Sequence, residues 1–157
     1  MVIYDKYVYI HIPKTGGSSI RKWLTETYEA TERDWHIPMS ESLVAEFPDH
    51  TFWCTVRNPY AVVGSHFHML KRFERTARKD WTFQAWVEHM RVHEIMQPFS
   101  SMVFDSATRI RLEDIEEFIP HENKGDVDCY KSLYCPTTYD IVTEVYEQDL
   151  KRHGYVF

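Results

Sequence analysis

One arrangement, an apolar strand followed at once by a loop and a helix, occurs twice in the first half of this chain. Residues 7–12 are mostly β-branched and aromatic and stop at Pro13, and residues 18–30 then carry apolar side chains at helical spacing. Residues 51–56 and the helix predicted over 60–73 repeat this order. Strands that alternate with helices favour a parallel sheet covered on both faces. The sequence therefore predicts an α/β fold.

The rest of the chain continues without a break that would mark a second domain. Residues 81–96 and 137–152 are predicted helices, the second with a Thr-x-x-Asp capping signal, and residues 102–110 are predicted to contain a short strand. Neither a repeat nor a Ser/Gly-rich linker interrupts the 157 residues. We therefore expect a single domain over residues 1–157, with a central parallel sheet flanked by helices.

Composition excludes several classes of protein. Hydrophobic residues make up 43% and charged residues 27%, which is a globular composition. No segment approaches the ~20 apolar residues of a membrane span, and the first six residues do not resemble a signal peptide. A cytoplasmic location without a membrane partner is therefore expected. The three cysteines form no C-x-x-C pair, which favours free thiols over a zinc site or a disulfide framework.

The net charge of −6 argues against a nucleic-acid-binding protein, but the charge is unevenly distributed. Residues 57–79 include six basic side chains and one acidic one, whereas residues 105–149 include four basic and twelve acidic ones. A local cationic site for an anionic ligand is therefore compatible with the acidic total.

The loop after the first predicted strand has the composition of an anion-binding loop. It reads His-Ile-Pro-Lys-Thr-Gly-Gly-Ser-Ser over residues 11–19. Small residues let several backbone N–H groups and a helix N-terminus point at one phosphate or sulfate, and Lys14 adds a positive charge. In a Walker A motif the lysine follows the glycines, whereas Lys14 precedes Gly16 and Gly17. A purely structural Gly-Gly turn would need neither the lysine nor the paired serines, so binding is favoured.

A second motif, Arg-Asn-Pro, follows the second predicted strand. Arg57 lies at the carboxyl end of that strand, where ligands of open α/β sheets collect, and Ser65 lies a little over two helical turns later. A guanidinium and a hydroxyl at these positions can hold one phosphate by charge-assisted hydrogen bonds. Taken alone, an Arg-Asn-Pro loop is more often structural than functional.

Together, the two motifs resemble those of the sulfotransferases that use 3′-phosphoadenosine 5′-phosphosulfate (PAPS). The segments at residues 110–115, 123–125 and 139–155 are similar to the arginine-glutamate segment, the Asn-Lys loop and the terminal helix of the carbohydrate sulfotransferase branch. This resemblance implies a P-loop-like fold of three layers. The chain is unusually short for the family, and the stretch over residues 81–113, which bears on acceptor binding, looks trimmed.

The resemblance implies a role for each motif residue. The first motif would hold the 5′-phosphosulfate and the second the 3′-phosphate. The implied cofactor-binding residues are Lys14, Thr15, Gly16, Gly17, Ser18, Ser19, Arg57, Ser65, Lys124 and Gly125. Lys14 would also act in catalysis, by neutralising charge on the oxygen that bridges to the leaving phosphate. His36 lies in a Trp-His-Ile-Pro segment similar to the Thr-His-Leu-Pro segment of cytosolic sulfotransferases, which implies that it is the catalytic base, although Asp34 replaces a frequent lysine.

The spacing of the remaining histidines does not indicate a metal site. His66 and His68 diverge by about 200° on a helix, and His89 and His93 share a face but have no obvious third ligand. His11 is expected to pack within the fold.

The expected function is transfer of a sulfuryl group from PAPS to a hydroxyl of a small-molecule or glycan acceptor, with a carbohydrate favoured. The transfer would be in line, with a histidine base and adenosine 3′,5′-bisphosphate (PAP) as product. Two alternatives stay open. One is a noncatalytic nucleotide-binding module that lost its acceptor pocket through shortening. The other is a P-loop ATP-dependent kinase, against which the Lys-before-Gly order argues.

Overall fold

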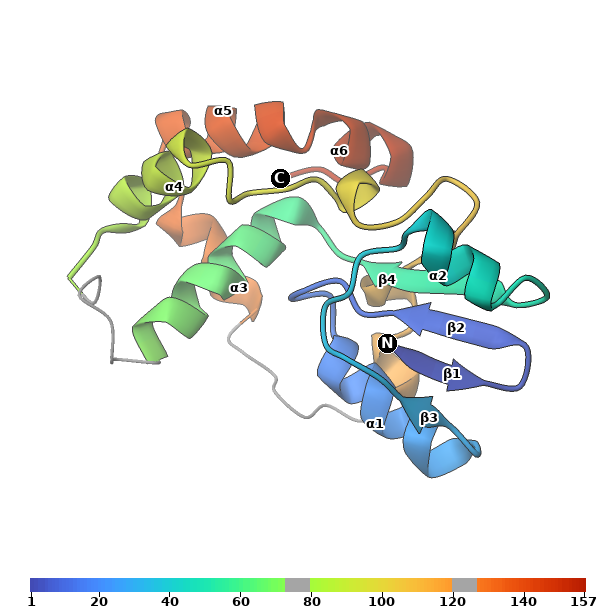
Figure 1. The fold of residues 1–157 in the computed structure, drawn as a ribbon. Helices are drawn as coiled ribbons and strands as arrows, with labels where there is room; N and C mark the ends of the chain where they lie inside the picture. The colour runs from blue at the N-terminus through green and yellow to red at the C-terminus, as the bar shows by residue number, and fades with distance from the viewer. Residues whose placement is uncertain (73–79, 120–126) are drawn as a thin grey trace. The chain divides into compact units, whose positions relative to one another are not determined.

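The computed structural model describes residues 1–72, 80–119 and 127–157. It divides into two compact units, each built from two segments of the chain: Met1–Arg57 with Phe99–Lys124, and Asn58–Pro98 with Gly125–Phe157. The first unit contains the β-sheet and the second is helical (Figure 1). The predicted α/β class is confirmed. No helix in the described part of the chain combines the length and the apolar character that a membrane crossing requires.

The sheet of the first unit has five strands in the order β3-β1-β2-β4-β5. They are β1 (Val2–Tyr4), β2 (Tyr7–Ile10), β3 (Thr31–Glu32), β4 (Thr51–Val56) and β5 (Thr108–Arg111). Strands β2, β4 and β5 run parallel, as expected, whereas β1 pairs antiparallel with both β2 and β3. The sheet is therefore mixed, because a tight turn at Asp5 returns β1 onto β2 and adds an antiparallel edge to the predicted parallel strands.

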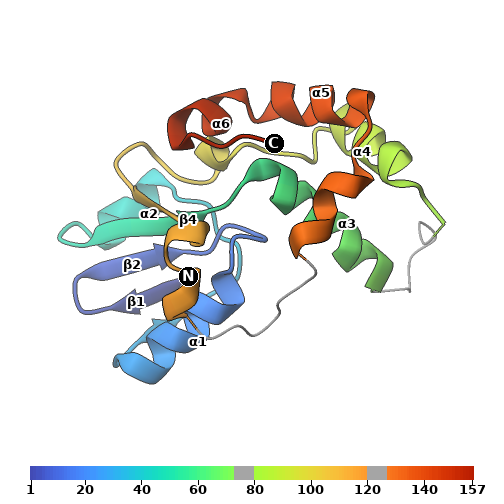
Figure 2. The ribbon, with the colours of Figure 1, turned by 180° about the vertical axis from the view of Figure 1, so that it is seen from behind.

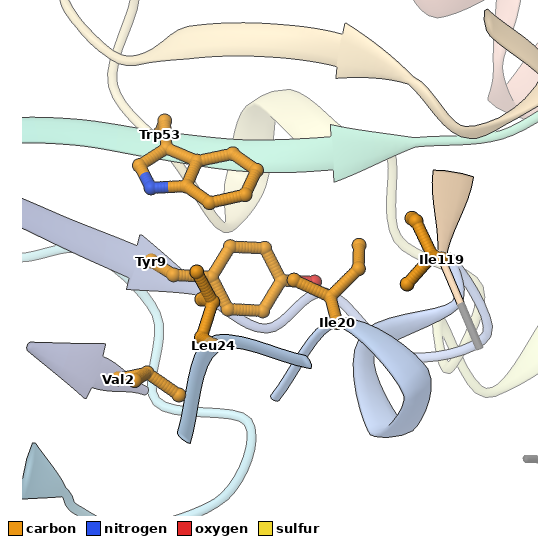
Figure 3. Close-up of a cluster of buried hydrophobic side chains, with 6 residues drawn as sticks. All are labelled: Val2, Tyr9, Ile20, Leu24, Trp53 and Ile119. Carbon is orange, nitrogen blue, oxygen red and sulfur yellow. The ribbon is translucent and has the colours of Figure 1, made fainter. Parts of the chain in front are cut away.

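Helix α1 (Gly17–Thr27) covers one face of this sheet (Figures 1 and 2). Tyr9 stands opposite Val2 and Trp53 on the neighbouring strands, and α1 packs Ile20 and Leu24 against this row. The cluster consists of Val2, Tyr9, Ile20, Leu24, Trp53 and Ile119 (Figure 3). Alternate residues of a strand face opposite sides, and the residues of β2 and β4 that face away from this cluster are also buried. Burial on both faces explains the continuous apolar run of β4.

Shorter elements complete the first unit. Helix α2 (Glu41–Glu46) begins at Ser40, whose hydroxyl accepts a hydrogen bond of 3.2 Å from the Leu43 N–H. Three 3₁₀ turns flank β5: η1 (Phe99–Ser101), η2 (Leu112–Asp114) and η3 (Glu116–Phe118). None of these elements was predicted, because each is too short to show a helical period in the sequence.

The second unit contains α3 (Pro59–Arg72), α4 (Phe83–Val92), η4 (Val127–Leu133), α5 (Pro136–Val145) and α6 (Glu147–His153). Helix α5 packs on α3 and α4, and η4 packs on α3. The single helix predicted over residues 137–152 is two helices separated at Tyr146. The first of these helices, α5, is capped by Thr138, whose hydroxyl accepts a 3.0 Å hydrogen bond from the Cys135 N–H. The predicted Thr-x-x-Asp signal does not form this cap.

Candidate functional site

The loop between β2 and α1 turns sharply just before the helix. Lys14 and Gly16 both have positive φ angles, of 66° and 82°. Gly16 is the N-cap of α1, no side chain caps the helix there, and its first turn contains no acidic residue. The first turn of α1 therefore offers no acidic side chain of its own to balance the positive end of the helix dipole, which suits an anion-binding helix start.

Buried hydroxyl groups hold this loop against the end of β4. The Thr15 hydroxyl donates to the Ile12 carbonyl at 2.9 Å, and the Thr55 hydroxyl donates to the Thr15 carbonyl at 2.9 Å. The Tyr9 hydroxyl lies 2.9 Å from the same Thr55 oxygen. The Thr15 hydroxyl therefore anchors the loop. The predicted role of Thr15 in anion binding would then belong to its backbone N–H.

Lys14 and Arg57 lie together at the carboxyl ends of the parallel strands. Ile10 pairs with Cys54, so β2 and β4 end side by side, and Arg57 Nη1 donates to the Lys14 carbonyl at 3.4 Å. Both side chains are half-buried. Burial, followed by the charge of Arg57, lowers the pKa of Lys14. Two cations whose charges act on each other in a half-buried position favour a ligand that carries negative charge.

His36 lies in the loop between β3 and α2 and contacts His11, with ring centroids 4.6 Å apart. Burial, followed by the charge of His36, lowers the pKa of His11 to about 3. Burial, followed by the charges of the Met1 ammonium, Arg21 and Lys14, lowers the pKa of His36. Both imidazoles are therefore neutral at pH 7, and a neutral imidazole is the form that accepts a proton.

Backbone strain coincides with two of the predicted functional residues. Among the described residues, the non-glycine positions with positive φ are Asp5, Lys14, His36 and Glu94. Asp5 lies in the β1–β2 turn and Glu94 just after α4. Lys14 lies in the turn before α1, and His36 lies at a bend of the β3–α2 loop. A positive φ costs about 1–2 kcal/mol for a residue with a Cβ atom. Strain of this kind is concentrated at functional sites.

The other predicted site residues are less closely grouped. Ser18 and Ser19 lie in the first turn of α1, with Ser18 exposed and Ser19 half-buried. Arg57 belongs to the first unit and Ser65, on α3, to the second, so their binding of one phosphate stays a prediction. Lys124 and Gly125 lie outside the described residues.

The Arg-Asn-Pro motif has a structural role as well. The Asn58 carboxamide oxygen accepts from the Tyr60 N–H at 3.1 Å, and its Nδ2 donates to the Val156 carbonyl at 2.8 Å. Pro59 is the first residue of α3, where a missing N–H costs nothing. Asn58 and Pro59 therefore start α3, and Arg57 is the residue of this motif left for ligand binding.

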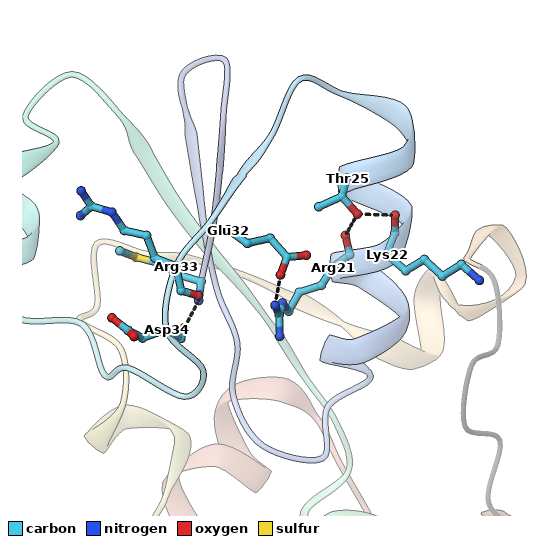
Figure 4. A network of polar contacts seen from close by, with 7 residues as sticks. Arg21, Lys22, Thr25, Glu32, Arg33 and Asp34 are labelled. Carbon is cyan, nitrogen blue, oxygen red and sulfur yellow. Dashed lines mark hydrogen bonds and ion pairs between the residues drawn. The ribbon is translucent and has the colours of Figure 1, made fainter.

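Sequence reasoning missed Arg21. This residue of α1 is 5% exposed and forms an ion pair with Glu32 of β3 (Figure 4). Its guanidinium carbon lies 3.5 Å from the centre of the Trp35 ring. Nearby, the Met1 ammonium donates to the Asp34 carbonyl at 2.5 Å. An Arg-Lys pair on a helix usually predicts an exposed face, so the sequence held no signal for this burial.

The histidines on the second unit do not assemble a metal site with other side chains. The rings of His89 and His93 meet, with centroids 4.3 Å apart, and Trp81 packs on His89. Within residues 1–72, 80–119 and 127–157, no group of three or more His, Cys, Asp or Glu side chains is placed to hold a metal ion.

No protein-family model, curated protein or solved structure matches the chain. The function is therefore inferred from the motifs and from the geometry of the first unit.

Proposed function

We propose that this protein is a PAPS-dependent sulfotransferase that transfers a sulfuryl group to a hydroxyl acceptor, with a carbohydrate favoured. The observation that carries the proposal is the meeting of Lys14 and Arg57 at the ends of β2 and β4, beside the start of α1 that no side chain caps. A nucleotide with several anionic groups suits such a concentration of positive charge. The proposal includes a P-loop-like, three-layer arrangement and a cytoplasmic location.

The cofactor-binding residues divide between the two phosphate positions of PAPS. The backbone of residues 15–19 and the side chain of Lys14 hold the 5′-phosphosulfate at the N-terminus of α1. Arg57 binds the 3′-phosphate, with Ser65 and the loop at Lys124 and Gly125 as further donors.

Transfer requires alignment of the two oxygens and a place for one proton. The acceptor oxygen bonds to sulfur while the bond from sulfur to the bridging phosphate oxygen breaks, so the SO₃ group passes between the two. His36 takes the hydroxyl proton, for which its lowered pKa keeps it in the neutral form. Lys14 stabilises the negative charge that develops on the leaving PAP.

Two measurements on the purified chain test this proposal. Calorimetry compares PAP with ATP and magnesium, and a transfer assay follows labelled sulfate from PAPS to glycans, phenols and peptides. We expect saturable PAP binding without magnesium and transfer to a hydroxyl acceptor. PAP binding without any transfer would instead identify a noncatalytic nucleotide-binding module. Preference for magnesium-ATP would identify a kinase, and binding of neither nucleotide would reject the nucleotide site altogether.

A further inference from the structure

Several buried side chains of the first unit hold polar atoms that have no hydrogen-bond partner, and two of these side chains contact the same indole ring. These two are Arg21, whose side chain is 6% exposed, and His11, which is 4% exposed. Their atoms without a partner are Nε and Nη1 of Arg21 and Nδ1 of His11. Buried polar groups are nearly always paired in folded proteins, so these three unpaired atoms are available to a ligand group.

Trp35 joins these two side chains into one cluster. Its ring centre lies 3.5 Å from the guanidinium carbon of Arg21 and 5.6 Å from the ring centre of His11. Trp35 is itself 59% exposed, whereas the two side chains it contacts are buried. The indole is therefore the exposed side chain of this cluster, and it lies against both buried ones.

The charges around the cluster favour a negatively charged ligand group. The cations that act on it are the Met1 ammonium, Arg21 and Lys14, since each contributes to the lowered pKa of His11 and the imidazoles themselves stay neutral. The acids are Glu32, which already pairs with Nη2 of Arg21 (Figure 4), and Asp34, whose charge acts on the Met1 ammonium. Arg21 therefore already has one carboxylate partner, and the neighbouring positive charges favour a further group that carries negative charge.

We propose that Arg21 and His11, beneath Trp35, bind a carboxylate group. Its oxygens accept hydrogen bonds from Arg21 Nη1 and from His11 in the Nδ1–H tautomer. A carboxylate is favoured over sulfate or phosphate because the few unpaired donors on Arg21 and His11 match the two oxygens of a planar anion. That the carboxylate belongs to the sulfuryl acceptor rests on the proposed function. The binding site itself does not, because its hydrogen-bond donors, Arg21 and His11, are not among the predicted cofactor-binding residues.

Nuclear magnetic resonance of the full ¹⁵N-labelled chain tests this site with acetate and benzoate as probes. We expect saturable shifts at the Arg21 Nε–H, at the Trp35 indole N–H and at the His11 ring. Arg21→Lys keeps the charge but removes Nη1, and should weaken binding about tenfold. The matched control is Arg33→Lys, since Arg33 is an exposed arginine paired with Glu46. It should leave the affinity unchanged.

Trp35→Ala is the second variant, because it removes an exposed side chain and leaves the buried charges in place. It should weaken the binding of benzoate more than that of acetate, because benzoate has a ring that the indole can contact. Equal affinities in the wild type and in Arg21→Lys, or shifts that never saturate, would overturn the proposal. The ion pair of Arg21 with Glu32 would then have only a structural role, which is to hold α1 against β3. Tighter binding of sulfate than of either carboxylate would overturn it as well.

A parallel titration with PAP separates this proposal from the proposed function. Carboxylate binding in a protein that does not bind PAP would support the site and reject the nucleotide function. PAP binding without carboxylate binding would support the nucleotide function and reject the carboxylate site. Displacement of benzoate by PAP would place the carboxylate site within the nucleotide site and overturn its assignment to the acceptor.

Discussion

The imidazole of His11 occupies the space in which a Cβ atom on Gly17 would lie. Such an atom would fall well inside van der Waals contact with Cδ2 and Nε2 of the ring. At the neighbouring Gly16, φ is 82°, and a Leu112 methyl group lies 2.6 Å from the place where a Cβ atom would be. The glycine pair is therefore needed for the turn and the packing of the loop, in addition to the predicted approach of an anion.

Gly17→Ala should destabilise the protein by about 1–3 kcal/mol, because the added methyl group forces His11 out of its position. Urea unfolding measures the change. The matched double variant, His11→Ala with Gly17→Ala, removes the obstructing ring and should show a favourable coupling energy of about 1 kcal/mol or more. Strictly additive effects of the two substitutions would contradict this packing.

Stability should fall as the pH falls from 7 to 5. The pKa of His11 is about 3 in the folded protein and 6.5 in a model compound, so between these values the unfolded chain binds the extra proton. Protonation therefore favours unfolding, by about 2 kcal/mol between pH 7 and pH 5. Urea unfolding at the two pH values measures this. His11→Gln should reduce the difference, whereas removal of the exposed His68 serves as the control and should not.

Thr55→Val should destabilise the fold by about 1–3 kcal/mol and weaken PAP binding. The substitution keeps the shape of the side chain but removes the hydroxyl that donates to the Thr15 carbonyl and meets the Tyr9 hydroxyl. Thr25→Val on α1 is a matched control, because the Thr25 hydroxyl bonds only to carbonyl groups of its own helix. Equal stability and PAP affinity in the two variants would show that Thr55 does not hold the loop.

Arg57→Ala should weaken PAP binding about tenfold or more, since a charge-assisted contact to a phosphate is lost. Calorimetry measures the affinity, with Arg33→Ala as the control on an exposed arginine outside the loop. PAP affinity that is the same in both variants would remove Arg57 from the nucleotide site.

His36→Ala should lower kcat by about 100-fold or more and leave PAP affinity in place, because a general base acts on the acceptor and not on the nucleotide. Transfer assays and calorimetry on the same preparation separate the two effects. Full turnover in this variant would assign the base to another residue, and His11→Gln would then be tested.

The parallel strands were predictable because each leaves a strong local mark. Residues 51–56 form β4 as predicted, since a strand buried on both faces is a continuous apolar run. The helix predicted over residues 60–73 is α3 at Pro59–Arg72, because Pro59 and the Asn58 cap mark its start. Strands β1 and β3 were not predicted. With two or three residues each, these strands are too short to show a hydrophobic period in the sequence. They form by pairing with other strands of the sheet.

The sequence by itself determined the order of the longer strands and helices and the positions of Lys14 and Arg57 after two of the strands, because hydrophobic period and turn residues are local properties. The tertiary structure decided which side chains meet. His11 against His36, Arg21 beneath Trp35 and Thr55 against Thr15 all join residues from different elements. Their burial and their pKa shifts follow from the pairing of strands and the packing of α1, which local pattern does not encode.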